Sequence, residues 1–219
     1  MGLGSWFRSG PPVLTPKEAY ARWAPSYDAT PHNPLMAAEQ SAVLAALPGV
    51  AGATVLDAGC GTGRYLAALA ERGASRLVGV DFSPEMLTRA ATPGGGRGLG
   101  DLTALPVAAA SIDLVASGLA LNDVPDLDAA IAELARVLRP GGTLVYSVVH
   151  PRGGALGWTR GFRTVTGEAM VGGCWHPVAA HERACAGARL RVDLTQDVAS
   201  VASPDGGPVA LVIRARKGA

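Results

Sequence analysis

A short glycine-rich loop carries the residue types best suited to chemistry. The acid Asp57 precedes glycines at alternate positions, Gly59, Gly61 and Gly63, and Cys60 stands between the first two. Glycine permits a tight turn and lets the backbone touch a ligand. The loop follows a short apolar run and precedes a helical pattern, which is where doubly wound α/β folds bind nucleotides.

The spacing of these glycines does not fit a dinucleotide. The G-x-G-x-x-G/A fingerprint counted from Gly59 ends at Arg64, where Gly or Ala is required. Asp57 also argues against a pyrophosphate, because a carboxylate repels it and attracts an ammonium group. A nicotinamide oxidoreductase is therefore the weaker interpretation of the loop.

Two further acids follow the next predicted strands. Asp81 ends an apolar run at 77–80, and a carboxylate there can accept hydrogen bonds from both hydroxyls of a ribose. Asp101 ends the following strand and can accept from an adenine amino group, with Phe82 and Met86 flanking the ring. Together these residues predict a ligand with an amine, a ribose and an adenine but no phosphate.

Sequence blocks across the middle of the chain carry a family resemblance. They lie, in order, at 56–63, 79–81, 100–106, 111–115 and 138–142. The stretch from 57 to 151 resembles a class I S-adenosylmethionine-dependent methyltransferase of the small-molecule group that includes ubiquinone and menaquinone methyltransferases. The resemblance implies S-adenosylmethionine as the cofactor and methyl transfer as the activity.

The resemblance also assigns roles to residues of this chain. The loop would lie under the methionine part, Asp81 would hold the ribose, Asp101 with the Leu102 amide would hold the adenine, and Gly118 would pass beside the sulfonium. A tyrosine of the N-terminal helices would cap the cofactor. The expected cofactor-binding residues are Tyr20, Asp57, Gly59, Cys60, Gly61, Gly63, Asp81, Phe82, Met86, Asp101, Leu102 and Gly118.

The candidate catalytic residues are predicted from their positions at the ends of strands and helices. His150 ends a predicted strand at the edge where ligands sit and is our first choice as a general base, and His176 begins the last helix near the same edge. Relatives often carry a His pair after the fourth strand, where this chain has Asn and Asp123, which could act as the base or orient one. Tyr27 is the remaining candidate.

The elements that must position these residues alternate between strand and helix. Predicted strands lie at 54–56, 77–80, 99–102, 112–116 and 143–149, with a turn at 94–96. Short apolar strands with helical crossovers predict a doubly wound, Rossmann-like α/β sheet. Alternating patterns at 189–198 and 208–216 around a turn at 204–207 predict an antiparallel hairpin. The resemblance implies a seven-stranded sheet with an antiparallel last strand in three α/β/α layers.

The chain divides into two predicted parts. Residues 1–50 form an N-terminal cap with helices at 17–27 and 34–47, and residues 51–219 form the cofactor-binding core. A Gly-rich segment at 151–176 carries aromatic residues and is interpreted as a lid-like insertion that contacts the substrate.

Composition narrows the possible partners. A net charge of +1 over 219 residues gives no electrostatic case for nucleic acid or for an anionic membrane. An odd count of 3 cysteines fits a reducing cytoplasm, and no apolar run is long enough to span a membrane. The spacing of Cys174, His176, His181 and Cys185 matches no common zinc pattern, so no metal is expected. We expect a cytoplasmic monomer or homodimer with a small-molecule substrate.

The sequence is compatible with several acceptors and activities. The acceptor atom can be oxygen, nitrogen or carbon, and a role in bacterial specialised metabolism rests on analogy. A nucleic-acid methyltransferase is disfavoured by the charge and by the absence of an Asn-Pro-Pro-aromatic block. The alternative is a relative that binds the cofactor without transferring methyl and promotes a cyclisation or rearrangement.

Overall fold

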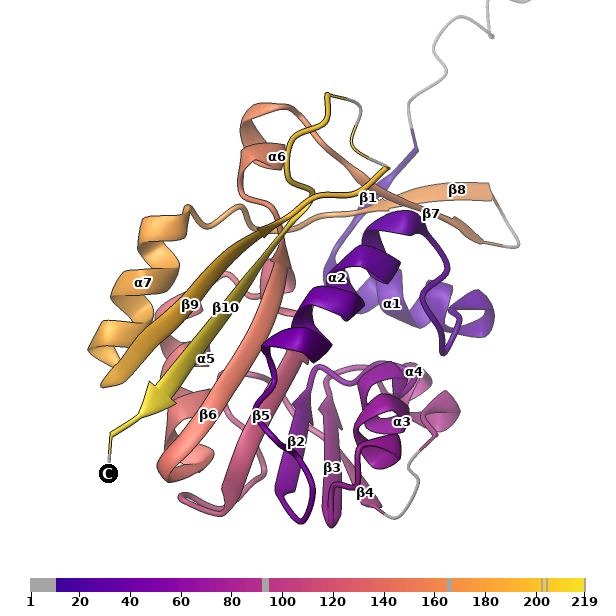
Figure 1. Cartoon of the computed structure of the whole chain (residues 1–219). Helices are drawn as coiled ribbons and strands as arrows, with labels where there is room; N and C mark the ends of the chain where they lie inside the picture. The colour runs from indigo at the N-terminus through magenta and orange to yellow at the C-terminus, as the bar shows by residue number, and fades with distance from the viewer. Residues whose placement is uncertain (1–10, 92–94, 165–166, 202, 204, 219) are drawn as a thin grey trace, which may run out of the picture.

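A computed structural model of the chain describes residues 11–91, 95–164, 167–201, 203 and 205–218 (Figure 1). Within these residues, seven strands form one sheet in the order β4-β3-β2-β5-β6-β10-β9. Their bounds are β2 Thr54–Ala58, β3 Arg76–Asp81, β4 Gly95–Leu99, β5 Ile112–Gly118, β6 Leu138–Val149, β9 Leu190–Val198 and β10 Ala210–Lys217.

The strand directions confirm the predicted topology. Neighbouring strands from β4 to β6 run parallel, and β10 runs antiparallel to both β6 and β9. The chain builds outward from β2 to β4 and then crosses back to place β5 beside β2. This reversal of strand order is a topological switch point, at which open α/β sheets bind ligands.

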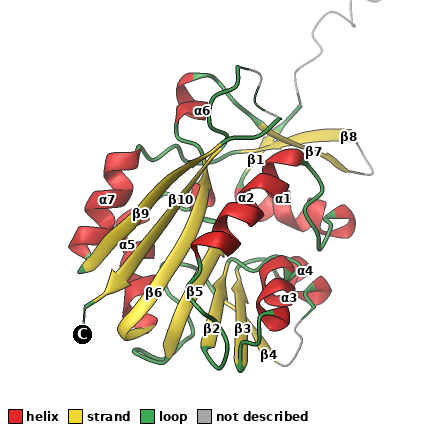
Figure 2. Ribbon diagram, viewed as in Figure 1, coloured by secondary structure: helices red, strands yellow, loops and turns green. Residues whose placement is uncertain are grey.

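Helices cover both faces of the large sheet, as Figure 2 shows. Helices α5 (Leu127–Val137) and α7 (Val178–Gly187) pack on one face, and α2 (Pro34–Ala46) and α3 (Arg64–Glu71) pack on the other. Helix α4 (Pro84–Arg89) lies beside β3 and β4. The apolar strands are thus buried on both sides, as a parallel sheet requires.

A second, three-stranded sheet joins distant parts of the chain. Strand β1 (Val13–Leu14) pairs in parallel with β8 (Gly167–Val171), which forms a hairpin with β7 (Arg160–Thr164). The segment 151–176, predicted as a lid-like insertion, contains the short helix α6 (Arg152–Ala155) followed by this hairpin, and its role as a lid stays a prediction. Helix α1 (Pro16–Trp23) packs against the hairpin, and the one-turn helix η1 (Ala24–Ser26) follows it.

The predicted N-terminal cap separates into two roles. Helix α1 begins with a capping box between Thr15 and Glu18 and lies with the small sheet beyond the carboxyl ends of β2, β3 and β5 (Figure 1). Helix α2 instead packs on the large sheet against β6 and β10. The boundary between residues 50 and 51 stays a prediction.

One strand prediction was wrong. The third strand, β4, occupies Gly95–Leu99 and not 99–102, and it includes two of the glycines assigned to a turn at 94–96. A Cβ on Gly95 would lie 2.1 Å from the Leu77 carbonyl oxygen, so this edge strand needs glycine to approach β3. Gly94 and Pro204, both assigned to turns, lie outside the described residues.

A buried histidine makes stability depend on pH. His181 of α7 is 1% exposed, and its Nδ1 lies 3.2 Å from the hydroxyl of Tyr146. Burial lowers the pKa of His181 to about 4, against about 6.5 in an unfolded chain. As pH falls from 7 to 4, the unfolded state takes up the proton that folded His181 does not bind. We expect this to lower the free energy of unfolding by up to ~3 kcal/mol.

Chemical denaturation of the wild type and His181→Gln between pH 4 and 7 measures this effect. The variant should lose this part of the pH dependence. His32→Gln is the matched control, because His32 is exposed. Equal pH slopes in the wild type and His181→Gln would contradict the assignment.

Candidate cofactor site

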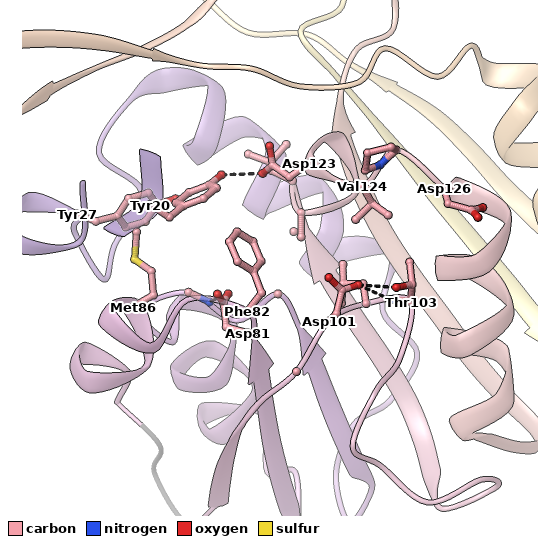
Figure 3. A pocket seen from close by; sticks show the side chains of 18 residues that line it. Tyr20, Tyr27, Asp81, Phe82, Met86, Asp101, Thr103, Asp123, Val124 and Asp126 are labelled. Carbon is pink, nitrogen blue, oxygen red and sulfur yellow. Dashed lines mark hydrogen bonds between the residues drawn. The ribbon is translucent and has the colours of Figure 1, made fainter. Parts of the chain in front are cut away.

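A cavity of about 350 Å³ opens at the switch point of the large sheet. Its size lies within the range of small-molecule sites. It is lined by the ends of β2, β3 and β5 and by η2 (Leu121–Asp123), with Tyr20 of α1 and Tyr27, which follows η1, supplying side chains from the opposite side (Figure 3). The lining residues are Tyr20, Tyr27, Gly59, Gly61, Asp81, Phe82, Met86, Gly100, Asp101, Leu102, Thr103, Gly118, Leu119, Ala120, Asp123, Val124, Pro125 and Asp126.

The glycine loop forms the floor of this cavity with its backbone already hydrogen-bonded. The amides of Gly59 and Cys60 donate to the Val80 carbonyl at 2.7 and 3.0 Å, and the Gly61 amide donates to Asp81 Oδ2 at 2.7 Å. Gly61 has φ +52 and would meet nothing within 4 Å if it carried a Cβ, so the loop is open at this point. These amides are not free to hold a phosphate, which agrees with the phosphate-free ligand expected from sequence.

Asp57 lies behind the loop as a buried, uncompensated acid. It is 1% exposed, and neither carboxylate oxygen has a hydrogen-bond partner among the described residues. Burial raises the pKa of Asp57 to about 7, although the nearby Arg64 guanidinium opposes the rise. A cationic group nearby would stabilise the ionised form of this buried carboxyl, since an opposite charge favours ionisation. An ammonium group is therefore the chemistry that fits here.

Asp81 is fixed by the backbone and faces the cavity. Its Oδ1 accepts from the Ser83 amide at 2.8 Å and its Oδ2 from the Gly61 amide at 2.7 Å. Burial raises the pKa of Asp81, although these two hydrogen bonds oppose the rise. Because each carboxylate oxygen can accept more than one hydrogen bond, Asp81 can still accept from the two hydroxyls of a ribose.

Asp101 lines the same cavity as Asp81 (Figure 3). Its Oδ1 accepts from the amide of Thr103 at 2.8 Å and from the Thr103 hydroxyl at 2.7 Å. These bonds hold the side chain in the cavity wall (Figure 3), where it and the Leu102 backbone can meet an amino-substituted ring.

Aromatic side chains close the cavity on the side of α1. Tyr20 stands 5.8 Å from Phe82 in an edge-on arrangement, and its hydroxyl donates to Asp123 Oδ2 at 2.9 Å (Figure 3). Tyr27 packs edge-on against Trp23, with ring centroids 4.8 Å apart and an interplanar angle of 68°. Rings in this position can cover an adenosyl group and exclude water from it.

The structure brings most of the predicted site residues to this cavity. Those in its lining are Tyr20, Tyr27, Gly59, Gly61, Asp81, Phe82, Met86, Asp101, Leu102, Gly118 and Asp123. Asp57 lies behind the loop, and Cys60 and Gly63 are loop residues outside the cavity lining. The Cys60 sulfur packs against Gly79, and Gly63 is the left-handed N-cap of α3.

The two histidines predicted as bases lie elsewhere. His150 pairs through Nε2 with Asp197 at 3.2 Å, and its Nδ1 accepts from the Arg152 amide at 3.2 Å. His176 Nε2 lies 2.9 Å from the Val124 carbonyl oxygen and faces another depression. Neither imidazole belongs to the cavity lining, because each is engaged in fixing a neighbouring loop.

A buried charge cluster beneath the site was not predicted from the sequence. Glu39 of α2 is 0% exposed and accepts from both terminal nitrogens of Arg64, at 3.0 and 3.1 Å. It also accepts from the hydroxyls of Tyr65, at 2.7 Å, and Ser147. The signal for this cluster is Arg64, which directly follows the glycine loop. There it breaks the dinucleotide fingerprint, but a buried arginine at this position also requires a charged partner.

The residues present fit S-adenosylmethionine. The orphaned oxygens of Asp57 suit its ammonium group, Asp81 suits the ribose and Asp101 suits the adenine, around a floor that has no free run of amides for phosphate. Among the described residues there is no group of three or more side chains that could hold a metal ion. Within that same part of the chain, no helix is both long and apolar enough to cross a membrane.

Comparison with known proteins identifies the family. Residues 56–146 match the family model described as a methyltransferase domain. A malonyl-[acyl-carrier protein] O-methyltransferase of Serratia marcescens is 34% identical over 206 residues, which cover 91% of this chain and 75% of that protein. A protein of the same name from Dechloromonas aromatica is 40% identical over 140 residues, and there the match spans 62% of this chain and 50% of the relative.

Solved structures agree. An S-adenosylmethionine-dependent methyltransferase from Mesorhizobium loti superimposes with a TM-score of 0.70 at 26% identity, covering 82% of this chain and 98% of that one. The finer resemblance to ubiquinone and menaquinone methyltransferases stays a prediction. The sheet, the cavity and these relatives together place the chain in the class I S-adenosylmethionine-dependent methyltransferases, as an enzyme that uses S-adenosylmethionine as its cofactor.

Proposed function

We propose that the enzyme methylates a small-molecule acceptor, at an oxygen atom, inside the cavity at the switch point. The observation that carries this proposal is that Asp81 and Asp101 line one cavity, while Asp57 lies buried and without a hydrogen-bond partner behind its glycine loop. The names of the relatives support oxygen as the acceptor atom, since they are O-methyltransferases. Their malonyl group on a carrier protein is a candidate acceptor for this chain as well, and a role in specialised metabolism remains part of the proposal.

When bound, the cofactor supplies an electrophilic methyl group on a sulfonium. The chain's own contribution is placement and shielding. Gly118 to Ala120 line the cavity at the end of β5, and a Cβ on Gly118 would lie 2.1 Å from the Tyr65 ring, so the wall is tightly packed there. Holding two reactants in line can supply ~7–11 kcal/mol of the barrier. A water-poor pocket also favours a step that disperses charge.

Of the groups that line this cavity, Asp123 is best placed to accept a proton or to orient the group that does. Its carboxylate is held between the Tyr20 hydroxyl and the Arg160 guanidinium. His150 and His176 remain predictions as bases, without a place in the lining.

Product analysis tests the proposal. Incubation of the purified chain with S-adenosylmethionine and malonyl-acyl carrier protein, or a panel of small hydroxy and carboxylic acids, should yield S-adenosylhomocysteine and the methylated acceptor. Tight cofactor binding with acceptor conversion but without S-adenosylhomocysteine would favour the non-methylating alternative.

Asp81→Ala should weaken the binding of S-adenosylhomocysteine by about 10- to 150-fold, because hydrogen bonds to a charged group contribute ~1.5–3 kcal/mol. Calorimetry on the purified protein measures this change. Asp128→Asn is the control, since Asp128 is an exposed acid outside the cavity lining. Unchanged affinity in Asp81→Ala would remove the assigned ribose site.

A further inference from the structure

One residue of the cofactor cavity has a backbone conformation that its side chain disfavours. Leu119, directly after β5, has φ +60, in the left-handed region that residues other than glycine rarely adopt. Among the described residues, the other positive φ angles outside glycine belong to Ala110 and Arg189, and neither lines the cavity. Since strained backbone clusters at functional sites, whatever holds Leu119 in this conformation is a candidate for a role in the site.

Ser147 holds this turn from the neighbouring strand β6. The Leu119 amide donates to the Ser147 carbonyl oxygen at 3.1 Å and to the Ser147 Oγ at 3.0 Å. Ser147 is 0% exposed, and its hydroxyl donates its own proton to Oε1 of Glu39. Because a hydroxyl has only one proton to donate, this bond leaves the lone pairs of the Ser147 oxygen for the amide. The turn at Leu119 is therefore secured by a buried chain of hydrogen bonds that begins at a carboxylate.

The same oxygen of Glu39 also fixes the side chain that packs against Gly118. Oε1 accepts from the Tyr65 hydroxyl at 2.7 Å, and a Cβ on Gly118 would lie 2.1 Å from the Tyr65 ring. At the other end of the turn, a Cβ on Gly59 would lie 2.4 Å from the Cβ of Ala120. The turn, which lines the cavity, is thus packed between the glycine loop and an aromatic ring, and its shape depends on close contacts.

We propose that Ser147 is a positioning residue for cofactor binding, which acts by holding the turn at Leu119 in its left-handed conformation. Ser147 does not line the cavity itself, so its effect on the ligand must pass through the turn. Without the hydroxyl, the turn relaxes toward conformations that leucine prefers, and only the fraction of molecules that keeps the left-handed turn binds the ligand tightly. The inference goes beyond the proposed function, because it concerns the cofactor and holds for any acceptor.

Calorimetry with S-adenosylhomocysteine on the full chain tests the role of Ser147. Ser147→Ala should weaken binding by about three- to tenfold, the range expected for one lost hydrogen bond. Glycine adopts a positive φ without steric cost, so the remaining contacts suffice to hold the turn in Leu119→Gly. Ser147→Ala made in Leu119→Gly should therefore weaken binding by less than about twofold relative to Leu119→Gly alone. Comparison within each background cancels the loss of the leucine side chain.

Ala110→Gly is the matched control background. It relieves another residue with a positive φ, but Ala110 is exposed and lies outside the cavity lining. Ser147→Ala should therefore weaken S-adenosylhomocysteine binding in Ala110→Gly by as much as it does in the wild type. A loss that disappears only in Leu119→Gly ties the effect of Ser147 to this one turn.

Two further substitutions at Leu119 test the turn without disturbing the buried cluster. Asparagine tolerates the left-handed region and is close to leucine in size, whereas β-branched valine disfavours that region. Leu119→Val should therefore bind S-adenosylhomocysteine more weakly than Leu119→Asn, by about threefold or more. If Ser147→Ala does not fold, the comparison of these two variants decides.

Several results would overturn the inference. Unchanged affinity in Ser147→Ala would show that the remaining bond to the Ser147 carbonyl oxygen holds the turn by itself. Equal losses from Ser147→Ala in the wild type and in Leu119→Gly would mean that the hydroxyl acts on the ligand by another route. A rescue by Ala110→Gly as large as that by Leu119→Gly, or equal affinities in Leu119→Val and Leu119→Asn, would remove the role of the strained turn.

Discussion

Asp57→Asn should weaken the binding of S-adenosylmethionine by about 30- to 150-fold, which corresponds to ~2–3 kcal/mol for losing the charged partner of a buried pair. The reason is the unusual state of this acid, which is 1% exposed and has no hydrogen-bond partner for either oxygen among the described residues. We expect the ligand's ammonium group to stabilise the ionised carboxylate, which the charge of Arg64 also favours in the free protein. Calorimetry on both proteins at pH 8 measures the difference.

The same residue should impose a pH dependence on cofactor affinity. With the pKa of Asp57 raised to about 7, most of the carboxyl is protonated at pH 6 and ionised at pH 8. Affinity should therefore rise by about tenfold between these values and then level off. Asp57→Asn should lack this step, and comparing the two profiles cancels the ligand's own titration. Parallel profiles would show that Asp57 does not meet the cation.

In the protein without ligand, the effect of Asp57 on the free energy of unfolding runs opposite to its effect on cofactor affinity. The folded pKa of Asp57 lies above its unfolded value of about 3.9, so the contribution to stability is present at low pH and is lost as pH rises toward 7. Asp57→Asn should therefore be more resistant to denaturant than the wild type at pH 8 when no cofactor is added. A residue that weakens the fold in order to bind a ligand is typical of functional sites.

The second large effect concerns Glu39. Glu39→Ala should lower the free energy of unfolding by ~3–5 kcal/mol, because it leaves Arg64 buried without its counter-charge. Arg64 is 8% exposed, and two of its nitrogens bond to Glu39. Urea denaturation at pH 7 measures the loss.

Gln40→Ala is the matched control for Glu39→Ala. Gln40 also accepts from Arg64, at 2.8 Å, but it is neutral, so its loss should lower the free energy of unfolding by only ~1 kcal/mol. Equal losses in the two variants would mean that the charge of Glu39 contributes little. A larger loss in Glu39→Ala, with cofactor affinity retained in the fraction that folds, would show that the cluster stabilises the fold without shaping the cofactor site.

The order of strands and helices was predictable because it depends on local periodicity. Short apolar runs ending in glycine or an acid marked β2 and β3 and placed Asp57 and Asp81 at the carboxyl edge. Strand β4 was mislocated because its five residues are GGRGL, which carry no apolar pattern. This segment forms a strand because it pairs closely with β3. That pairing depends on the tertiary structure and leaves no local sequence pattern.

The second sheet had no local signal at all. Strand β1 has two residues, and it pairs with a segment from the other end of the chain. For the same reason, the Asp123–Arg160 pair and the Glu39–Arg64 pair were not foreseen, since each joins residues that only the folded chain brings together. His150 followed the rule that ligands gather at strand ends, but the chain turns into α6 there and the ring bonds to Asp197.

The parallel pairing of Val13 with Met170 has a consequence for synthesis of the chain. Domains fold as their N-terminal parts emerge, and contacts between distant residues form late. The small sheet behind α1 therefore cannot be completed until β8 has been synthesised, long after the residues of the glycine loop. A nascent chain that ends before β8 lacks the hairpin against which α1 packs, and α1 supplies Tyr20 to the cavity, so we expect such a chain to release its ligand faster than the full chain does.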